Sequence, residues 1–236
     1  MSDQLYDLAP LSLLRQQSWL SPAFPTGSYS YSHGLEWAVE VAHINDRESL
    51  VDWLEADLRY GSGRNEGIFF SEAWRCAIDD DRTKLIEIAE LAAAFRGTSE
   101  FALESSQQGA ACLTTLRRVW PDRILDWLSE ILCERNVQPA IAVVLGIRSA
   151  RVGVSVNLAL PAFLLSYIAS LVAAGVRLIP LGQTDGQLAI ADLEESVLAA
   201  SAQAKKATID DLGSAAFMVD LASMAHETQY TRLFRS

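Results

Sequence analysis

The amino-acid sequence predicts an all-α fold, a single compact domain of about ten helices around a long central apolar helix. Apolar residues recur at intervals of three and four along most of the chain, which keeps their side chains on one face of a helix. The apolar and polar alternation of a half-buried strand is scarce. The stretch 158–176 carries no charge at all, which suits the buried centre of a helical domain.

Three apolar stripes illustrate this spacing within the expected helices. They consist of Leu50, Val51, Leu54 and Leu58; of Leu85, Ile88, Ala92 and Phe95; and of Ile124, Leu128, Ile131 and Leu132. Taken in order along the chain, helices are expected at 8–18, 34–43, 46–60, 65–79, 83–96, 98–119, 122–135, 138–149, 155–179, 185–206 and 213–227.

Capping residues set the expected helix starts. Asn45 with Glu48, and Thr184 with Gln187, have the spacing of a reciprocal N-terminal cap. Helices are expected to stop at residues that break the pattern, which are Gly61 and Gly63, Pro121, and Pro180 with Gly182.

Small residues and a proline shape two of these helices. Ser105, Gly109 and Cys112 lie on one face of helix 98–119 and would let a neighbouring helix come close. Pro161 is expected to kink or start the long apolar helix. Since no linker, repeat or shift of composition divides the chain, one domain over 1–236 is expected, with flexible tails at about 1–8 and 228–236.

The charge-free stretch also raises the question of a membrane. Its nineteen residues reach the ~18 that a transmembrane helix needs. However, Pro161, Ser166, Tyr167 and Gly175 dilute its hydrophobicity, and no aromatic belt brackets it. We therefore interpret the stretch as a buried core helix, or as a face shared with a second copy of the chain.

Charge and cysteine usage restrict the partners and the compartment. A net charge of −11 disfavours nucleic acid and anionic lipid as partners. Cys76, Cys112 and Cys133 share no metal-like spacing and are interpreted as reduced core residues. The N-terminus carries acids where a secretory signal would be basic, so a cytoplasmic location is expected.

The sequence offers little for catalysis. It has only three histidines, His33, His43 and His226. In "HETQY" a zinc-protease helix would need a histidine where Tyr230 stands, and "GSGRNEG" lacks the Lys and Ser/Thr of a phosphate-binding loop. No metal site is predicted, and a binding protein is favoured over an enzyme.

Three polar segments interrupt the helical pattern: "FPTGSYSYSHGLE" from Phe24, "GVRLIPLGQTDGQ" from Gly175, and "HETQYTRLFRS" from His226. The first combines adaptable serines with rigid tyrosines, as recognition loops do, or is simply a capped turn. The last combines aromatic residues with arginines, which dominate binding energy at protein interfaces. A frayed end, or a tail that folds back on its own core, remains the alternative for it.

Together with "ESSQQGAACL" from Glu104, these segments resemble the successive signatures of the UreF family of urease accessory proteins, in order and rough separation, over about residues 10 to 236. The chain has Val137, Gln138 and Pro139 where the family's "H-x-P" segment would have a histidine, so that histidine's role is not carried over. Milder departures are Phe24, Thr26 and Ser28, where Leu, Val and Ala are common.

The resemblance implies an all-α homodimeric adaptor without catalytic activity or a cofactor of its own. With a UreD-type partner, called UreH in some organisms, such a protein binds apo-urease and recruits the UreG GTPase, whose nickel passes to the urease active site. The phosphate-binding loop that this chain lacks would then belong to the GTPase.

Mapped onto this sequence, the resemblance places UreD/UreH binding on the C-terminal tail, with Tyr230, Arg232, Leu233, Phe234 and Arg235. The surface facing the dimer partner or the GTPase, or a nickel route, would include Arg177, Gln183, Thr184, Asp185 and Gln187. The polar residues of this second group could pass hydrated Ni²⁺ or merely cap a helix. Tyr29, Ser30, Tyr31, His33 and Glu36 form the expected interaction loop.

Two further hypotheses stay open at this point. Arg177, Arg232 or Arg235 could act in trans on the bound GTPase, or could only anchor interfaces. The alternative to an adaptor is a helical-bundle enzyme with a small-molecule pocket under the long apolar helix, in which His33 or His226 carries protons.

Overall fold

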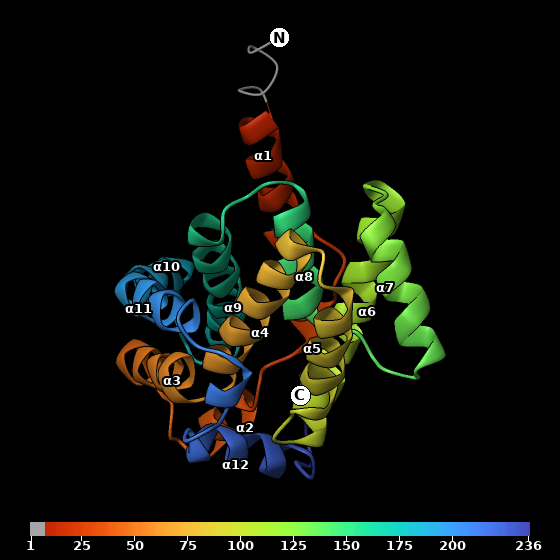
Figure 1. Ribbon diagram of the computed structural model, residues 1–236. Helices are drawn as coiled ribbons and strands as arrows, with labels where there is room; N and C mark the ends of the chain where they lie inside the picture. The colour runs from red at the N-terminus through yellow and green to blue at the C-terminus, as the bar shows by residue number, and fades with distance from the viewer. Residues whose placement is uncertain (1–7) are drawn as a thin grey trace.

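The computed structural model describes residues 8–236, and within this range the fold is all-α, as predicted (Figure 1). The α-helices are α1 Leu8–Leu20, α2 Leu35–Glu40, α3 Arg47–Tyr60, α4 Ser62–Asp79, α5 Arg82–Ala94, α6 Ser99–Val119, α7 Arg123–Glu134, α8 Ile141–Arg151, α9 Val156–Leu178, α10 Gln183–Asp192, α11 Glu194–Ala204 and α12 Phe217–His226. Short 3₁₀ turns lie at Ser28–Ser30 and Ile209–Asp211. The expected flexible segment 1–8 lies outside the described residues except for Leu8.

Helices α4 and α8 form the most extensively packed helix pair of the core. Nearly the whole of α8 is buried, including Arg148 and Ser149. The close approach depends on Gly146, because a Cβ at this position would come within 2.5 Å of the Phe70 carbonyl oxygen. The core of the domain therefore requires the absence of a side chain at Gly146.

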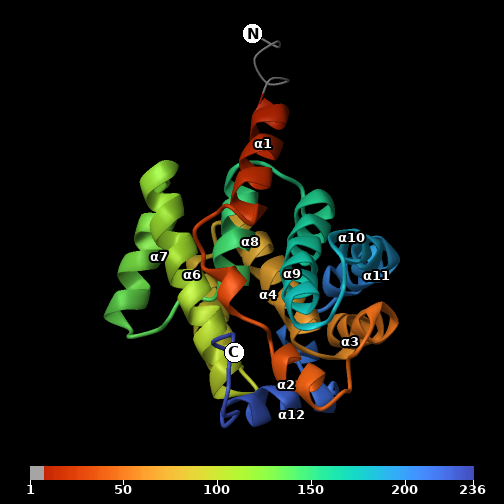
Figure 2. The ribbon, with the colours of Figure 1, turned by 180° about the vertical axis from the view of Figure 1, so that it is seen from behind.

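The long apolar helix α9 occupies the central position predicted for it and packs against α3, α4, α8, α10 and α11 (Figures 1 and 2). Pro161 lies inside this helix, within its first two turns. In the part of the chain that the structure describes, α9 is the one helix long and apolar enough to cross a membrane, and half of its most apolar window is buried within the domain. This is weak evidence for a membrane span, because core helices pass the same test.

Both predicted N-terminal caps were wrong in register. Helix α3 is capped by Asp46 instead of Asn45: its carboxylate accepts the Ser49 amide at 2.8 Å, and the Ser49 hydroxyl in turn accepts the Asp46 amide. Helix α10 begins one residue before Thr184, and Asp185 accepts the Gly182 amide at 3.0 Å. In each case a carboxylate accepts an amide at the helix start that would otherwise lack a partner. The predicted cap lies one position away for α3 and two positions away for α10.

Several helix boundaries also differ from the prediction. The expected helix 34–43 ends at Glu40, because Ala42 adopts a positive φ of 63°. The expected helix 185–206 is divided at the fully buried Leu193 into α10, which packs on α9 and α3, and α11, which also packs on α4. Gly61 does end α3, but Gly63 lies inside α4.

The cysteine and small-residue predictions had mixed outcomes. Cys76 and Cys112 are buried, whereas Cys133 is exposed, so the core prediction was wrong for Cys133. On α6, Gly109 does permit a close approach, because a Cβ there would overlap the Pro139 carbonyl group. The segment that leads into α8 thus packs directly on the backbone of α6.

Replacing Gly109 with alanine should therefore destabilise the fold. The new methyl group meets backbone atoms of Pro139 that cannot swing aside, so Gly109→Ala should lower the free energy of unfolding by about 1–3 kcal/mol. Chemical denaturation measures the change. Gly213→Ala is the matched control, since a Cβ at Gly213 meets no atom within 4 Å. Equal stability of the two variants would show that the close approach is not required.

Candidate interaction site at the C-terminal tail

The chain after α12 folds back along α6 and the loop before α2 (Figure 2). The Arg235 amide donates to the Ser30 carbonyl at 2.8 Å, and the Ser236 carbonyl accepts from both the amide and the hydroxyl of Ser32. Ser236 and Phe234 are buried. The end of the tail is packed on the domain, which is the alternative that the sequence left open for it.

Glu36, in the first turn of α2, receives the backbone of the tail. Its Oε1 accepts the Leu233 amide at 2.6 Å, and its Oε2 accepts the Phe234 amide at 2.9 Å. The carboxylate is buried at the N-terminal end of a helix, where the macrodipole favours a negative charge. Two charge-assisted hydrogen bonds to consecutive amides hold the tail in one register.

His226, the last residue of α12, joins Glu36 to α6. Its Nε2 lies 3.1 Å from Glu36, and its Nδ1 lies 2.9 Å from both carboxylate oxygens of Glu100. Arg232 approaches Glu100 from the solvent side, with 3.3 Å between its Nη1 and the Glu100 Oε1. Burial raises the pKa of Glu100, and the hydrogen bond to His226 and the charge of Arg232 act against this rise. Two carboxylates, an imidazole and a guanidinium thus form one charge cluster beneath the tail.

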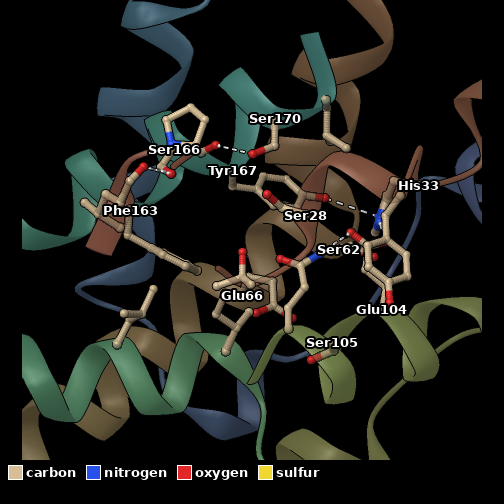
Figure 3. A pocket seen from close by; sticks show the side chains of 18 of the residues that line it. Ser28, His33, Ser62, Glu66, Glu104, Ser105, Phe163, Ser166, Tyr167 and Ser170 are labelled. Carbon is tan, nitrogen blue, oxygen red and sulfur yellow. Dashed lines mark hydrogen bonds and ion pairs between the residues drawn. The ribbon is translucent and has the colours of Figure 1, made fainter. Parts of the chain in front are cut away.

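His33 is the centre of a second buried cluster (Figure 3). Its Nδ1 lies 3.1 Å from Glu104, which also accepts the Ser236 hydroxyl. Its Nε2 lies 3.2 Å from the hydroxyl of Tyr167, which donates to Asp57 at 2.7 Å. The imidazole ring stacks on Phe101 with 3.9 Å between ring centroids. The tail, the loop, α3, α6 and α9 all meet at this imidazole.

The electrostatics of the His33 cluster follow from its burial. Burial lowers the pKa of His33, but the Glu104 and Asp57 carboxylates raise it by more, so it lies above its ordinary value. Burial raises the pKa of Asp57, against the opposing effects of His33 and of the Tyr167 hydrogen bond. Burial and the charge of Asp57 together raise the pKa of Tyr167 well above its ordinary value. The arrangement favours a protonated His33 between two acids.

The loop geometry explains part of the motif "FPTGSYSYSHGLE". His33 and Gly34 both have positive φ, 57° and 79°, and a Cβ on Gly34 would lie 2.8 Å from the Ser223 amide nitrogen of α12. Tyr31 is buried, and its hydroxyl donates to Gln107 at 2.8 Å, whereas Tyr29 is 75% exposed. Most of the expected interaction loop therefore builds the domain, and Tyr29 remains at the surface.

The five predicted tail residues separate into buried anchors and an exposed face. The Phe234 ring is buried 4.3 Å from the Arg177 guanidinium. Arg232 and Arg235 bind Glu100 and Gln107 on α6. Tyr230 is fully exposed, and Leu233 is 66% exposed although its amide is held by Glu36. The tail presents an aromatic and an aliphatic side chain to solvent, and its backbone is held at Leu233, Phe234 and Arg235.

The residues predicted to face the dimer partner, the GTPase or a nickel route are brought together only in part. Arg177 reaches the tail through Phe234, and burial lowers its pKa. Gln183, Thr184 and Gln187 lie exposed at the start of α10, which packs on α9 and α3. Asp185 has the capping role described above. Among the described residues, no group of three His, Cys, Asp or Glu side chains is arranged to hold a metal ion.

A cavity of about 90 Å³ lies beneath α9, between α4 and α6 (Figure 3). His33 and Tyr167 line it, whereas His226 belongs to the tail cluster, so the structure does not bring the two histidines together. Four buried polar atoms on its wall have no hydrogen-bond partner within the protein, on Trp19, Glu66, Arg96 and Ser105. A space of this size and polarity suits a few ordered waters.

Sequence reasoning missed the groups that receive the tail. Glu100 and Glu104 are two buried acids four residues apart on α6, and Asp57 and Tyr167 lie on helices that were interpreted as packing elements. The signal that could have found the first two was their place within "EFALESS", where acids at helical spacing accompany apolar residues.

Comparisons with known proteins agree with the motifs. The family model described as UreF matches residues 44–194. A urease accessory protein UreF of Rhodopseudomonas palustris (strain BisB5) is 47% identical over 95% of this chain and 91% of its own length. UreF of Bradyrhizobium sp. (strain BTAi1) is 44% identical over 100% of this chain and 97% of its own length. The resemblance drawn from the sequence motifs is confirmed.

The stability of the chain should depend on pH through His33. Because the folded-state pKa of His33 is raised, its pair with Glu104 contributes fully below the unfolded value of 6.5, and the contribution is lost as the pH rises through the folded-state pKa. Glu104→Gln removes the carboxylate that raises this pKa. The variant should therefore lose less stability than the parent as the pH rises above the unfolded value of 6.5, measured by urea unfolding.

The charge-matched control is Glu48→Gln, an exposed acid on α3 outside both clusters. It should keep the pH dependence of the parent chain. Identical pH dependence in Glu104→Gln and the parent would contradict the assignment to His33.

The tail should be released when Glu36 loses its charge. In Glu36→Gln one oxygen acceptor is replaced by a donor, so the Leu233 and Phe234 amides should exchange with solvent at least about tenfold faster. Hydrogen exchange of the C-terminal peptide measures this, again with Glu48→Gln as the control. Unchanged exchange in Glu36→Gln would mean that this carboxylate does not hold the tail.

Proposed function

The chain belongs to the UreF family of urease accessory proteins, and we propose that it is a non-catalytic adaptor in nickel delivery. In this proposal a homodimer of the chain, in the cytoplasm, joins apo-urease, a UreD/UreH-type accessory protein and a UreG-type GTPase. The nickel is cargo of the assembled complex, and the chain needs no cofactor of its own.

The observation that carries the proposal is the anchored tail with its exposed face. Glu36 fixes the tail backbone, while Tyr230 and Leu233 point into solvent. Rigid aromatic and aliphatic side chains on a preorganised backbone bind partners at a low cost in conformational entropy. The tail thus supports the role of a docking element for the UreD/UreH-type protein.

The helix that leads into the tail extends this apolar surface. Phe217, Leu221 and Met224 are spaced by four and three residues on α12 and are 69%, 52% and 48% exposed. Spacing of this kind places them along one helical face, and a continuous exposed apolar face is typical of a protein interaction site. We propose that the face of α12 and the tail together receive the partner.

The packing of the tail bears on the hypothesis that an arginine of this chain acts in trans on the GTPase. Arg177 packs on Phe234, Arg232 pairs with Glu100, and Arg235 contacts Gln107. These contacts favour anchoring of the tail over insertion of an arginine into a GTPase, because insertion would require each contact to break. We propose the exposed side chains of Gln183, Thr184 and Gln187 on α10 as the surface for the GTPase or for hydrated nickel. Oxygen ligands alone hold nickel weakly, which suits the passage of nickel.

The enzyme alternative has one observation in its favour, namely that His33 and Tyr167 line the cavity beneath α9. The cavity of about 90 Å³ is smaller than the ~300–1,000 Å³ of typical ligand pockets. The family and the size of the cavity both favour the adaptor.

Partner binding should depend on the exposed face of the tail. Tyr230→Ala and Leu233→Ala should each weaken binding of a UreD/UreH-type partner by about tenfold or more, because they remove exposed contact area without touching the buried anchors. Size-exclusion chromatography with light scattering, followed by titration calorimetry, measures complex formation.

Leu198→Ala is the matched control, a leucine of α11 that is 59% exposed and lies outside the tail and α12. Removal of residues 230–236 should abolish the complex, and circular dichroism then distinguishes lost binding from lost folding. Full affinity in both tail variants would overturn the proposed docking role.

A further inference from the structure

A groove of about 480 Å³ gathers positive charge on a strongly acidic protein. It is bordered by the side of α1, the turn between α6 and α7, and the C-terminal end of α8. Three arginines line it, Arg15 from α1 and Arg148 and Arg151 from α8, with Asp122 as the one carboxylate among the lining residues. The groove lies outside every surface assigned above to a partner.

Asp122 does not satisfy these guanidinium groups. Its Oδ2 lies 3.4 Å from Arg148, and its Oδ1 lies 3.7 Å from Arg151 while also accepting the Ile124 amide that begins α7. Charge-assisted hydrogen bonds are ordinarily ~2.7–2.9 Å long. The aspartate is thus shared between two loose ion pairs and a helix cap, and no ion pair within the described residues engages Arg15.

Arg148 forms the buried part of the groove. Its side chain is only 4% exposed, its guanidinium lies 5.5 Å from the centre of the Trp19 ring, and its Nε has no hydrogen-bond partner. Burial, together with Arg15 and Arg151, lowers the pKa of Arg148, against the effect of Asp122. A buried guanidinium with a free donor beside two like charges is costly unless an anion compensates it.

A purely structural explanation covers only part of this arrangement. Arg148 and Arg151 lie in the last turn of α8, where positive side chains interact favourably with the helix macrodipole. That effect requires neither the burial of Arg148 nor an arginine from α1. The convergence of separate helices on one recess is what an anion site requires.

We propose that the groove of Arg15, Arg148 and Arg151 binds a phosphate-type oxoanion, either inorganic phosphate or the phosphoryl group of a small phosphomonoester. The guanidinium fork matches the oxygen geometry of such a group. Three guanidinium groups against one carboxylate suit a dianion, and the recess admits a compact group more easily than a protein side chain carried on a backbone.

The test is titration calorimetry of the full chain with inorganic phosphate and with glycerol 3-phosphate, at constant ionic strength set by chloride. Both arginines with accessible side chains can be varied without disturbing the core, as Arg15→Gln and Arg151→Gln. Each change should weaken binding about tenfold, because it removes a charge-assisted contact. Arg47→Gln, which loses the same charge from an exposed pair on α3, should leave binding unchanged.

The outcomes distinguish the two sources of phosphate and show whether the proposal fails. Tighter binding of glycerol 3-phosphate would identify a phosphomonoester as the ligand, and equal binding would identify inorganic phosphate as sufficient. No saturable binding of either probe, undiminished binding in both groove variants, or equal competition by acetate would overturn the proposal.

Discussion

The buried carboxylate of Glu36 is the interaction on which the arrangement of the site depends. It accepts two consecutive tail amides and lies 3.1 Å from His226, so one side chain joins α2, α12 and the tail. An uncompensated buried charge would be expensive, and these partners offset that cost only while the tail is in place. Docking of the tail and desolvation of the Glu36 carboxylate therefore occur together.

The rest of the fold positions these groups from a distance. The close pairing of α4 with α8 and the central place of α9 fix Asp57, Tyr167 and the loop that carries His33. Helix α6 supplies Glu100 and Glu104 one turn apart, the first toward His226 and the second toward His33. The tail contacts acids of both histidine clusters, so its packing is coupled to the hydrogen bonding of both sites.

The sequence predicted the fold class, the central apolar helix, the close approach at Gly109 and the family, because these depend on local spacing or on specific motifs. The break at Leu193 was not predictable in this way, because a buried apolar residue continues a helical pattern and only packing shows that the chain turns there. The caps at Asp46 and Gly182 were missed by one and two positions, differences that spacing rules do not resolve.

The site was predicted as a set of segments and not as a set of contacts. Tyr230 and Leu233 could be named from composition, but their separation from the buried Phe234 depends on which amides Glu36 receives. The acids of α6 and the arginine groove join residues far apart in the chain, and no local pattern indicates such convergence.

The central claim is that an anchored tail presents its exposed face to a partner. Hydrogen exchange across residues 227–236, compared between the free chain and its complex with a UreD/UreH-type protein, tests this most directly. The account predicts that the Leu233 and Phe234 amides are already protected in the free chain and that the segment around Tyr230 gains protection in the complex. A tail that exchanges freely when alone, or that gains no protection in the complex, would contradict it.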